Sequence, residues 1–89
     1  TEYSMSLGAA LLNYGDLRVK TGRYPEAVAL YDRAVGQLTH NGPVRPGVRS
    51  GDLLGQALWG RARCRERTRE YAAAARDYAG AERFADTYE

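Results

Sequence analysis

The chain has 89 residues, which is enough for one small domain, and its single cysteine excludes an internal disulfide. Apolar residues make up 44% and charged residues 27%, a balance typical of folded proteins and outside that of disordered chains. The net charge of +2 is too small to predict a nucleic-acid or membrane-surface protein unless the charge is concentrated on one face.

The sequence shows no targeting or membrane segment. No apolar run approaches the roughly 20 residues that cross a bilayer, and no signal peptide opens the chain. The first residue is Thr1 rather than Met, so we expect residues 1–89 to form one domain cut from a longer protein. One thiol fits a reducing compartment without requiring one, which favours a soluble intracellular protein but leaves the localisation unknown.

The first predicted helix covers residues 1–21, where apolar side chains recur at steps of three and four. Gly22 then supplies a residue that tolerates the left-handed conformation at a helix end. Pro25 follows near the first position of the next helix, 24–39, where a missing N–H group costs nothing. The sequence therefore predicts two antiparallel helices joined by a tight turn.

The second half of the chain repeats this pattern after a loop. Residues 40–51 hold three glycines and two of the three prolines, which predicts an irregular connection. A third helix is expected over 52–68, with Ser50 or Asp52 as its N-cap, and a fourth over 70–84.

A shift of 47 residues (71 − 24) relates the two predicted helix pairs. Aromatic and small residues on one helix face recur at this shift: Tyr24 as Tyr71, Ala27 as Ala74, Tyr31 as Tyr78 and Ala34 as Ala81. A period that covers two helices indicates a duplicated helix–turn–helix unit, with repeat one at about 7–39 and repeat two at about 52–86. The second turn has Arg69 in the place of Gly22, so it must avoid the left-handed region or accept a penalty of about 1 kcal/mol.

These features resemble the tetratricopeptide repeat family. The glycine, tyrosines and alanines of the family pattern are matched in repeat one by Gly22, Tyr24, Ala27, Tyr31 and Ala34, and the last four match again in repeat two. The resemblance implies an all-α helical-repeat fold, an α-solenoid of two antiparallel helix pairs. The chain departs from the family in its period, which is 47 residues rather than about 34.

The resemblance also implies a concave groove lined by the first helix of each pair. The groove positions are Ala9, Leu12, Asn13, Asp16, Val19 and Lys20 in repeat one, and Gln56, Trp59, Gly60, Arg63, Glu66 and Arg67 in repeat two. Among them we expect partner binding by Leu12, Asn13, Asp16, Lys20, Gln56, Trp59, Arg63 and Arg67. The only tryptophan, Trp59, suits an interaction hot spot, with packing against the 23–25 turn or the long loop as the alternative.

Arg18 and Arg65 stand at the same position of the two repeats, where the family usually has tyrosine. One interpretation is structural: the two side chains lie along the helix pair and meet carboxylates such as Asp32, Glu66 or Asp77. The other is that they bind an anionic group of a partner. The sequence leaves both open.

The sequence predicts neither catalysis nor a cofactor or metal site. His40 is the only histidine and stands at a helix end, where a cation is stabilised by the helix dipole. Cys64 stands at a position that needs a small buried group. The carboxylates are dispersed, so no acid–base pair stands out.

Five arginines alternate along the third helix, which raises the question of nucleic acid. Helical geometry splits them into two narrow rows on opposite sides: Arg61, Arg65 and Arg69 toward the partner helix, and Arg63 and Arg67 away from it. A single stripe that could follow a phosphate backbone is missing, so a nucleic-acid partner is not expected.

We therefore expect a non-catalytic module that binds a protein or peptide on its concave helix face. The first alternative is an architectural or self-associating module, completed by further repeats or by a homodimer through Tyr78, Phe84 and Tyr88, because two repeats bury little core. The second is binding of RNA or another anionic ligand through Arg63, Arg67 and Lys20.

Overall fold

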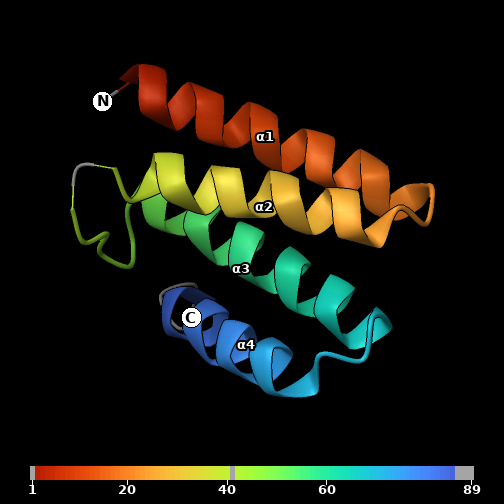
Figure 1. The fold of residues 1–89 in the computed structure, drawn as a ribbon. Coiled ribbons are helices and arrows are strands. Elements are labelled where there is room, and N and C mark those ends of the chain that lie inside the picture. Colours follow the sequence, from red (N-terminus) through yellow and green to blue (C-terminus); the bar gives the residue numbers. More distant parts are fainter. Residues whose placement is uncertain (1, 41, 86–89) are drawn as a thin grey trace.

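Residues 2–40 and 42–85, the residues that the computed structural model describes, form four helices and no strand: α1 (Glu2–Lys20), α2 (Tyr24–Leu38), α3 (Arg49–Arg67) and α4 (Tyr71–Ala85). The helices stack in chain order from α1 to α4 (Figure 1). The predicted all-α class is confirmed.

The 47-residue shift holds at the turn inside each helix pair. Adding 47 to the last residue of α1 (20) gives the last residue of α3 (67), and adding it to the first residue of α2 (24) gives the first residue of α4 (71). Because the helices run without interruption from these turns, the two pairs can be compared residue by residue.

The two turns share one backbone conformation although one has a glycine and the other an arginine. Gly22 has φ 75°, and the amide after it donates to the carbonyl of Arg18 at 2.9 Å. Arg69 has φ 65°, and the amide after it donates to the carbonyl of Arg65 at 2.7 Å. The second turn thus enters the left-handed region and accepts the steric penalty, because the helix-ending hydrogen bond requires that conformation.

Helix α3 begins at Arg49, three residues before the predicted start (52 − 49), so the connection is shorter than 40–51. The expected polar caps are wrong: the N-cap is Val48, in an extended conformation and without a side-chain cap hydrogen bond. The sequence misled here because Gly51 reads as a loop residue, whereas it lies inside the helix. A Cβ at Gly51 would lie 2.4 Å from the carbonyl oxygen of Arg45, so the glycine lets the connection pass close to α3.

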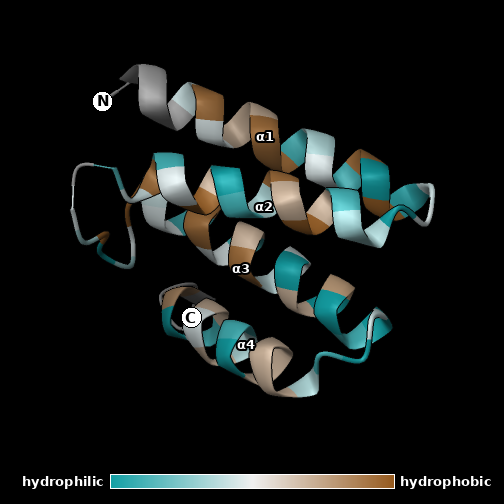
Figure 2. Ribbon diagram, in the orientation of Figure 1, coloured by the Kyte–Doolittle hydropathy of each residue, from teal (hydrophilic) through white to brown (hydrophobic). Residues whose placement is uncertain are grey.

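Tyr31 of α2 occupies the centre of the core and is 1% exposed. Its ring is held between glycines of two other helices: a Cβ at Gly15 of α1 would lie 2.8 Å from the ring, and a Cβ at Gly60 of α3 would lie 2.6 Å from it. Helix α3 thus packs on both α1 and α2, whereas α4 packs on α3 alone among the described helices. Figure 2 shows the stronger apolar residues in α1, α2 and the first half of α3, and a hydrophilic second half of α3.

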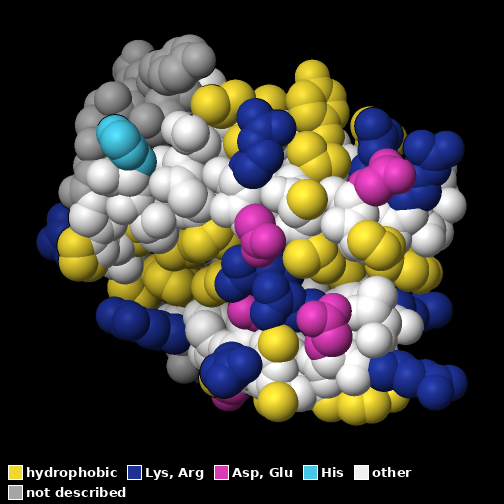
Figure 3. Space-filling model, viewed as in Figure 1, with side chains coloured by type: hydrophobic (Ala, Val, Ile, Leu, Met, Phe, Trp, Pro, Cys, Tyr) yellow, Lys and Arg dark blue, Asp and Glu magenta, His cyan; other side chains and the backbone are white. Residues whose placement is uncertain are grey.

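A cluster of two arginines and two aspartates joins α2, α3 and α4. Arg61 donates to both carboxylate oxygens of Asp77 at 2.9 and 2.8 Å, and to Asp32 at 2.7 Å. Burial opposes the charged form of Arg61, but these hydrogen bonds outweigh it and hold the guanidinium pKa above its ordinary value. Acidic and basic side chains meet in the middle of the face drawn in Figure 3, between α2 and α4.

Arg65 completes the cluster, with its Nε 3.7 Å from Asp77 and its Nη2 4.0 Å from Asp32. Its counterpart Arg18 pairs with Glu26 at 3.2 Å on the surface. Both repeated arginines therefore contact carboxylates of their own chain, which favours the structural interpretation of the pair.

Candidate functional site

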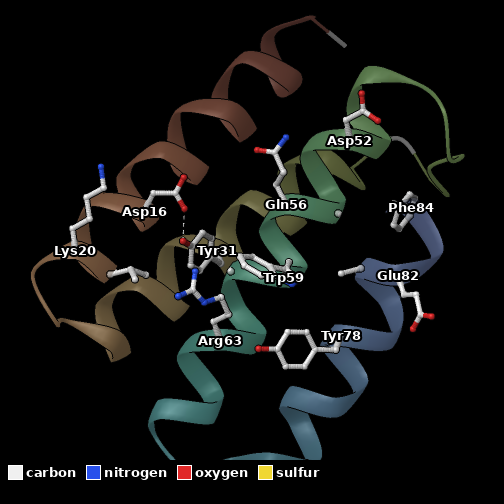
Figure 4. A pocket seen from close by; sticks show the side chains of 14 residues that line it. Asp16, Lys20, Tyr31, Asp52, Gln56, Trp59, Arg63, Tyr78, Glu82 and Phe84 are labelled. Carbon is white, nitrogen blue, oxygen red and sulfur yellow. Dashed lines mark hydrogen bonds between the residues drawn. The ribbon is translucent and has the colours of Figure 1, made fainter. Parts of the chain in front are cut away.

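A cavity of about 880 Å³ opens along the stack. Helix α1 contributes one wall, α3 runs through the middle, α4 contributes the opposite wall, and Tyr31 of α2 lies at the bottom (Figure 4). The small residues Gly55 and Gly60 on α3, and Ala81 on α4, form part of its lining.

Five of the eight predicted partner-binding residues line this cavity: Asp16, Lys20, Gln56, Trp59 and Arg63. Val19 and Gly60 of the wider predicted groove line it as well. One helical stripe on α1 and one on α3 thus face the same space.

The other three predicted residues lie elsewhere. Leu12 is 3% exposed and belongs to the hydrophobic core, so it is not available to a ligand. Asn13 is exposed but does not line the cavity. Arg67 places its guanidinium 5.8 Å from the centre of the Tyr24 ring, against the first helix pair.

The α4 wall was not predicted from the sequence. It consists of Tyr78, Ala81, Glu82 and Phe84, and Asp52 adds a carboxylate at the start of α3. The resemblance assigns the groove to the first helix of each pair and therefore overlooks the second. The prediction that Phe84 is exposed is wrong, since it is 6% exposed, and Tyr88 lies outside the described residues.

Trp59 and Arg63 form the most exposed aromatic feature of the cavity. The indole is 50% exposed, and the guanidinium of Arg63 lies 4.8 Å from the ring centre. The two residues are one helical turn apart, so the cation covers one ring face while the rest remains accessible. A half-exposed tryptophan in a concave site can bury a large apolar area on binding.

The charges of the cavity are separated. Lys20 and Arg63 lie toward one end, and Asp52 and Glu82 lie toward the other (Figure 4). Asp16 is beside Lys20, but one of its oxygens accepts a hydrogen bond of 2.5 Å from the Tyr31 hydroxyl. The basic end is therefore complementary to an acidic group of a ligand, and the other end to a basic group.

The chemistry-bearing residues that the sequence singled out lie apart from the cavity. Cys64 is 1% exposed, and burial raises the pKa of its thiol, which disfavours the reactive thiolate. His40 is exposed near the end of α2. Among the described residues no group of three or more His, Cys, Asp or Glu side chains is placed to hold a metal ion.

Comparisons with protein-family models, with curated proteins and with solved structures found no match to this chain. Within residues 2–40 and 42–85, no helix is both long and apolar enough to cross a membrane.

Proposed function

We propose that this chain is a helical-repeat module of tetratricopeptide type that binds a segment of a protein or a peptide in the cavity between α1, α3 and α4. The 47-residue offset between the two turns and between the residues on either side of them supports a duplicated helix pair. The observation that carries the binding proposal is that five predicted groove residues, one of them the half-exposed Trp59, line one cavity.

The ligand is an extended or helical segment with an apolar anchor and charged groups at both ends. The anchor covers the free surface of Trp59, where burial of apolar area stabilises the complex. An acidic side chain or terminal carboxylate pairs with Lys20 and Arg63, and a basic side chain pairs with Glu82. Electrostatic complementarity of this kind fixes the direction in which the segment lies.

A non-catalytic role fits the position of the reactive groups. The buried thiol of Cys64 is out of reach of a substrate in the cavity, and the cavity residues include no histidine. One oxygen of the Asp16 carboxylate accepts the hydrogen bond from Tyr31.

Binding of RNA is less well supported than binding of a protein. Arg61 and Arg65, two of the five arginines along and just beyond α3, are engaged by Asp32 and Asp77. The cations left near the cavity are few, and Asp52 and Glu82 repel phosphates at its other end.

The test is selection of peptides from a random display library against the 89-residue chain, followed by titration of a selected peptide with the fluorescence of Trp59 as the signal. Because Trp59 is the only tryptophan, its emission reports the cavity alone. We expect a blue shift as the indole loses contact with water. Calorimetric titrations of Trp59→Ala and Arg63→Ala should show binding weakened by about tenfold or more.

The control is Val48→Ala, which removes an exposed apolar side chain outside the cavity and should leave the affinity unchanged. Undiminished binding by both cavity variants would mean that the partner uses another face. Affinity for single-stranded RNA that falls steeply between two salt concentrations, with no selected peptide, would support the anionic-ligand alternative instead.

A further inference from the structure

At the 47-residue shift, the α4 wall of the cavity corresponds to a surface of α2 that α3 covers. Tyr31 of α2 is covered by α3 at Gly60, and Leu12 is buried in the core that α1, α2 and α3 share. Forty-seven residues later, the corresponding residues are Tyr78 and Trp59, which line the open cavity. The second pair thus presents the surface on which the first pair receives α3, but no described helix covers it.

At the 47-residue shift, the outer face of α1 corresponds to the face of α3 that packs on α1 and α2. Arg61 of α3 bonds Asp32 of α2, and Cys64 is buried in the shared core. The residues at these places on α1 are Tyr14 and Leu17, which are 55% and 51% exposed. Apolar side chains therefore stand in solvent where their counterparts are engaged within the molecule.

A contact between a cation and an aromatic ring inside the molecule has its counterparts on the two exposed faces. Within the molecule Arg67 of α3 lies over the ring of Tyr24 at 5.8 Å. The counterpart of Arg67 on α1 is Lys20, and the counterpart of Tyr24 on α4 is Tyr71, which is 63% exposed. The chain thus carries a second cation and a second ring, placed on opposite ends of the stack.

The exposed apolar residues are concentrated on these two faces. Among residues 6–40 and 42–84, five large hydrophobic residues are exposed, and four of them belong to these faces: Tyr14, Leu17, Trp59 and Tyr71. Figure 3 shows hydrophobic side chains both at the α1 edge of the stack and at the α4 edge. Large apolar side chains gathered in this way indicate a contact surface.

We propose that a second copy of this chain docks its α1 on α4 and α3 of the first copy, in the way that α3 docks on α2 and α1 within the molecule. Leu17 and Tyr14 of one copy cover Trp59 and Tyr78 of the other, together with Ala79, the counterpart of Asp32 (32 + 47). Lys20 lies over Tyr71. The contact joins two different faces, so each copy keeps one free face and further copies add head to tail.

One residue makes this contact looser than the internal one. Asn13 of α1 stands where α3 has Gly60, and a Cβ at Gly60 would lie 2.6 Å from the Tyr31 ring. Tyr78 of the other copy must therefore lie farther from α1 than Tyr31 does from α3. We expect association that is reversible and rises with protein concentration.

Sedimentation equilibrium of the 89-residue chain over a wide concentration range tests the proposal. The weight-average mass should rise from that of the monomer beyond that of a dimer. Leu17→Asp, on the α1 face, and Ala79→Arg, on the α4 face, should each weaken association by about tenfold or more, because each places a charge in an apolar contact. Both positions are exposed, so the variants should keep the helical circular dichroism of the wild type.

Mixing the two variants separates a head-to-tail contact from a symmetric one. Leu17→Asp keeps an intact α4 face and Ala79→Arg keeps an intact α1 face, so an equimolar mixture should form a heterodimer and nothing larger. Val48→Asp, outside both faces, should associate like the wild type. A mixture that stays monomeric, or a wild type that stays monomeric at the highest concentration, overturns the proposal.

The inference assigns a second occupant to the cavity of the proposed function, and the two fail separately. The Leu17→Asp variant has an unaltered cavity, and its titration with a selected peptide tests peptide binding in the absence of self-association. Peptide binding by this variant, together with a monomeric wild type, would retain the proposed function and reject head-to-tail docking. Self-association without any selected peptide would retain head-to-tail docking and reject the proposed function.

Discussion

Arg69 shows how one residue can carry a measurable strain. Its φ of 65° lies in the left-handed region that glycine adopts without penalty, and Gly22 supplies that glycine in the equivalent turn. We expect Arg69→Gly to raise the free energy of unfolding by about 1 kcal/mol, measured by urea denaturation. Arg69→Ala should bring no gain, because alanine has the same Cβ. An equal gain from both variants would show that loss of the arginine charge is the cause.

Tyr31 makes the free energy of unfolding depend on pH in the alkaline range. Burial, followed by the hydrogen bond from its hydroxyl to Asp16, raises its pKa above the ordinary value of 10.0. In the unfolded chain Tyr31 loses its proton near pH 10, whereas in the folded chain it keeps it, so the unfolded state binds fewer protons above pH 10. The contribution of Tyr31 to stability is therefore complete below pH 10 and decreases as the pH rises further.

Replacing Tyr31 by phenylalanine tests this dependence. Tyr31→Phe should lower the free energy of unfolding at pH 7 by about 1 kcal/mol, through loss of the hydrogen bond, and should make the decrease above pH 10 shallower. Tyr71→Phe is the matched control, since Tyr71 is 63% exposed and lies outside the core. An unchanged alkaline slope in Tyr31→Phe would contradict the assignment.

Close packing between helices depends on where the glycines stand. Gly60 of α3 faces Tyr31, where an added Cβ would lie 2.6 Å from the ring, whereas Gly36 of α2 has no atom within 4 Å of such a Cβ. We expect Gly60→Ala to lower the free energy of unfolding by about 1–3 kcal/mol through overpacking. Gly36→Ala should raise it by up to about 1 kcal/mol, because alanine favours the helix. Thermal unfolding of both variants against the wild type measures the difference, and similar changes in the two would show that helix propensity dominates.

The sequence predicts the positions of the helices better than it predicts the structural role of each glycine. Periodic apolar residues and the 47-residue shift locate all four helices, because both signals are local and repeated. The sequence places Gly51 in a loop, since composition does not distinguish a glycine that bends the chain from one that permits a close approach. That distinction depends on Arg45, which packs against α3 only once the connection has folded back.

The sequence predicts the cavity residues on α1 and α3 but not those on α4. The family resemblance assigns Asp16, Lys20, Gln56 and Trp59 to a shared groove, and these four residues line the cavity. The α4 wall depends on which of the described helices pack against α4, and sequence periodicity within one helix carries no information about its neighbours. Comparison of the two helix pairs residue by residue supplies that information, because the first pair shows what covers such a wall.

The arginine–aspartate cluster connects three helices and makes the packing of α4 depend on charge. Asp77 is 6% exposed and receives two hydrogen bonds from Arg61, while the side chain of Asp32 at the edge of the cluster is 48% exposed. We expect Asp77→Ala to lower the free energy of unfolding by about 3 kcal/mol, because Arg61 and Arg65 would remain partly buried without their main counter-ion.

Asp32→Ala is the matched control for the same cluster. Its pair with Arg61 is open to solvent, so the loss should stay within about 1 kcal/mol. Urea unfolding at pH 7 in 0.1 and 1 M NaCl measures both variants, and the cost of Asp77→Ala should change little with salt because solvent ions screen buried pairs weakly. Equal costs for the two variants would mean that the cluster is screened throughout, and α4 would then be held to α3 by apolar contacts alone.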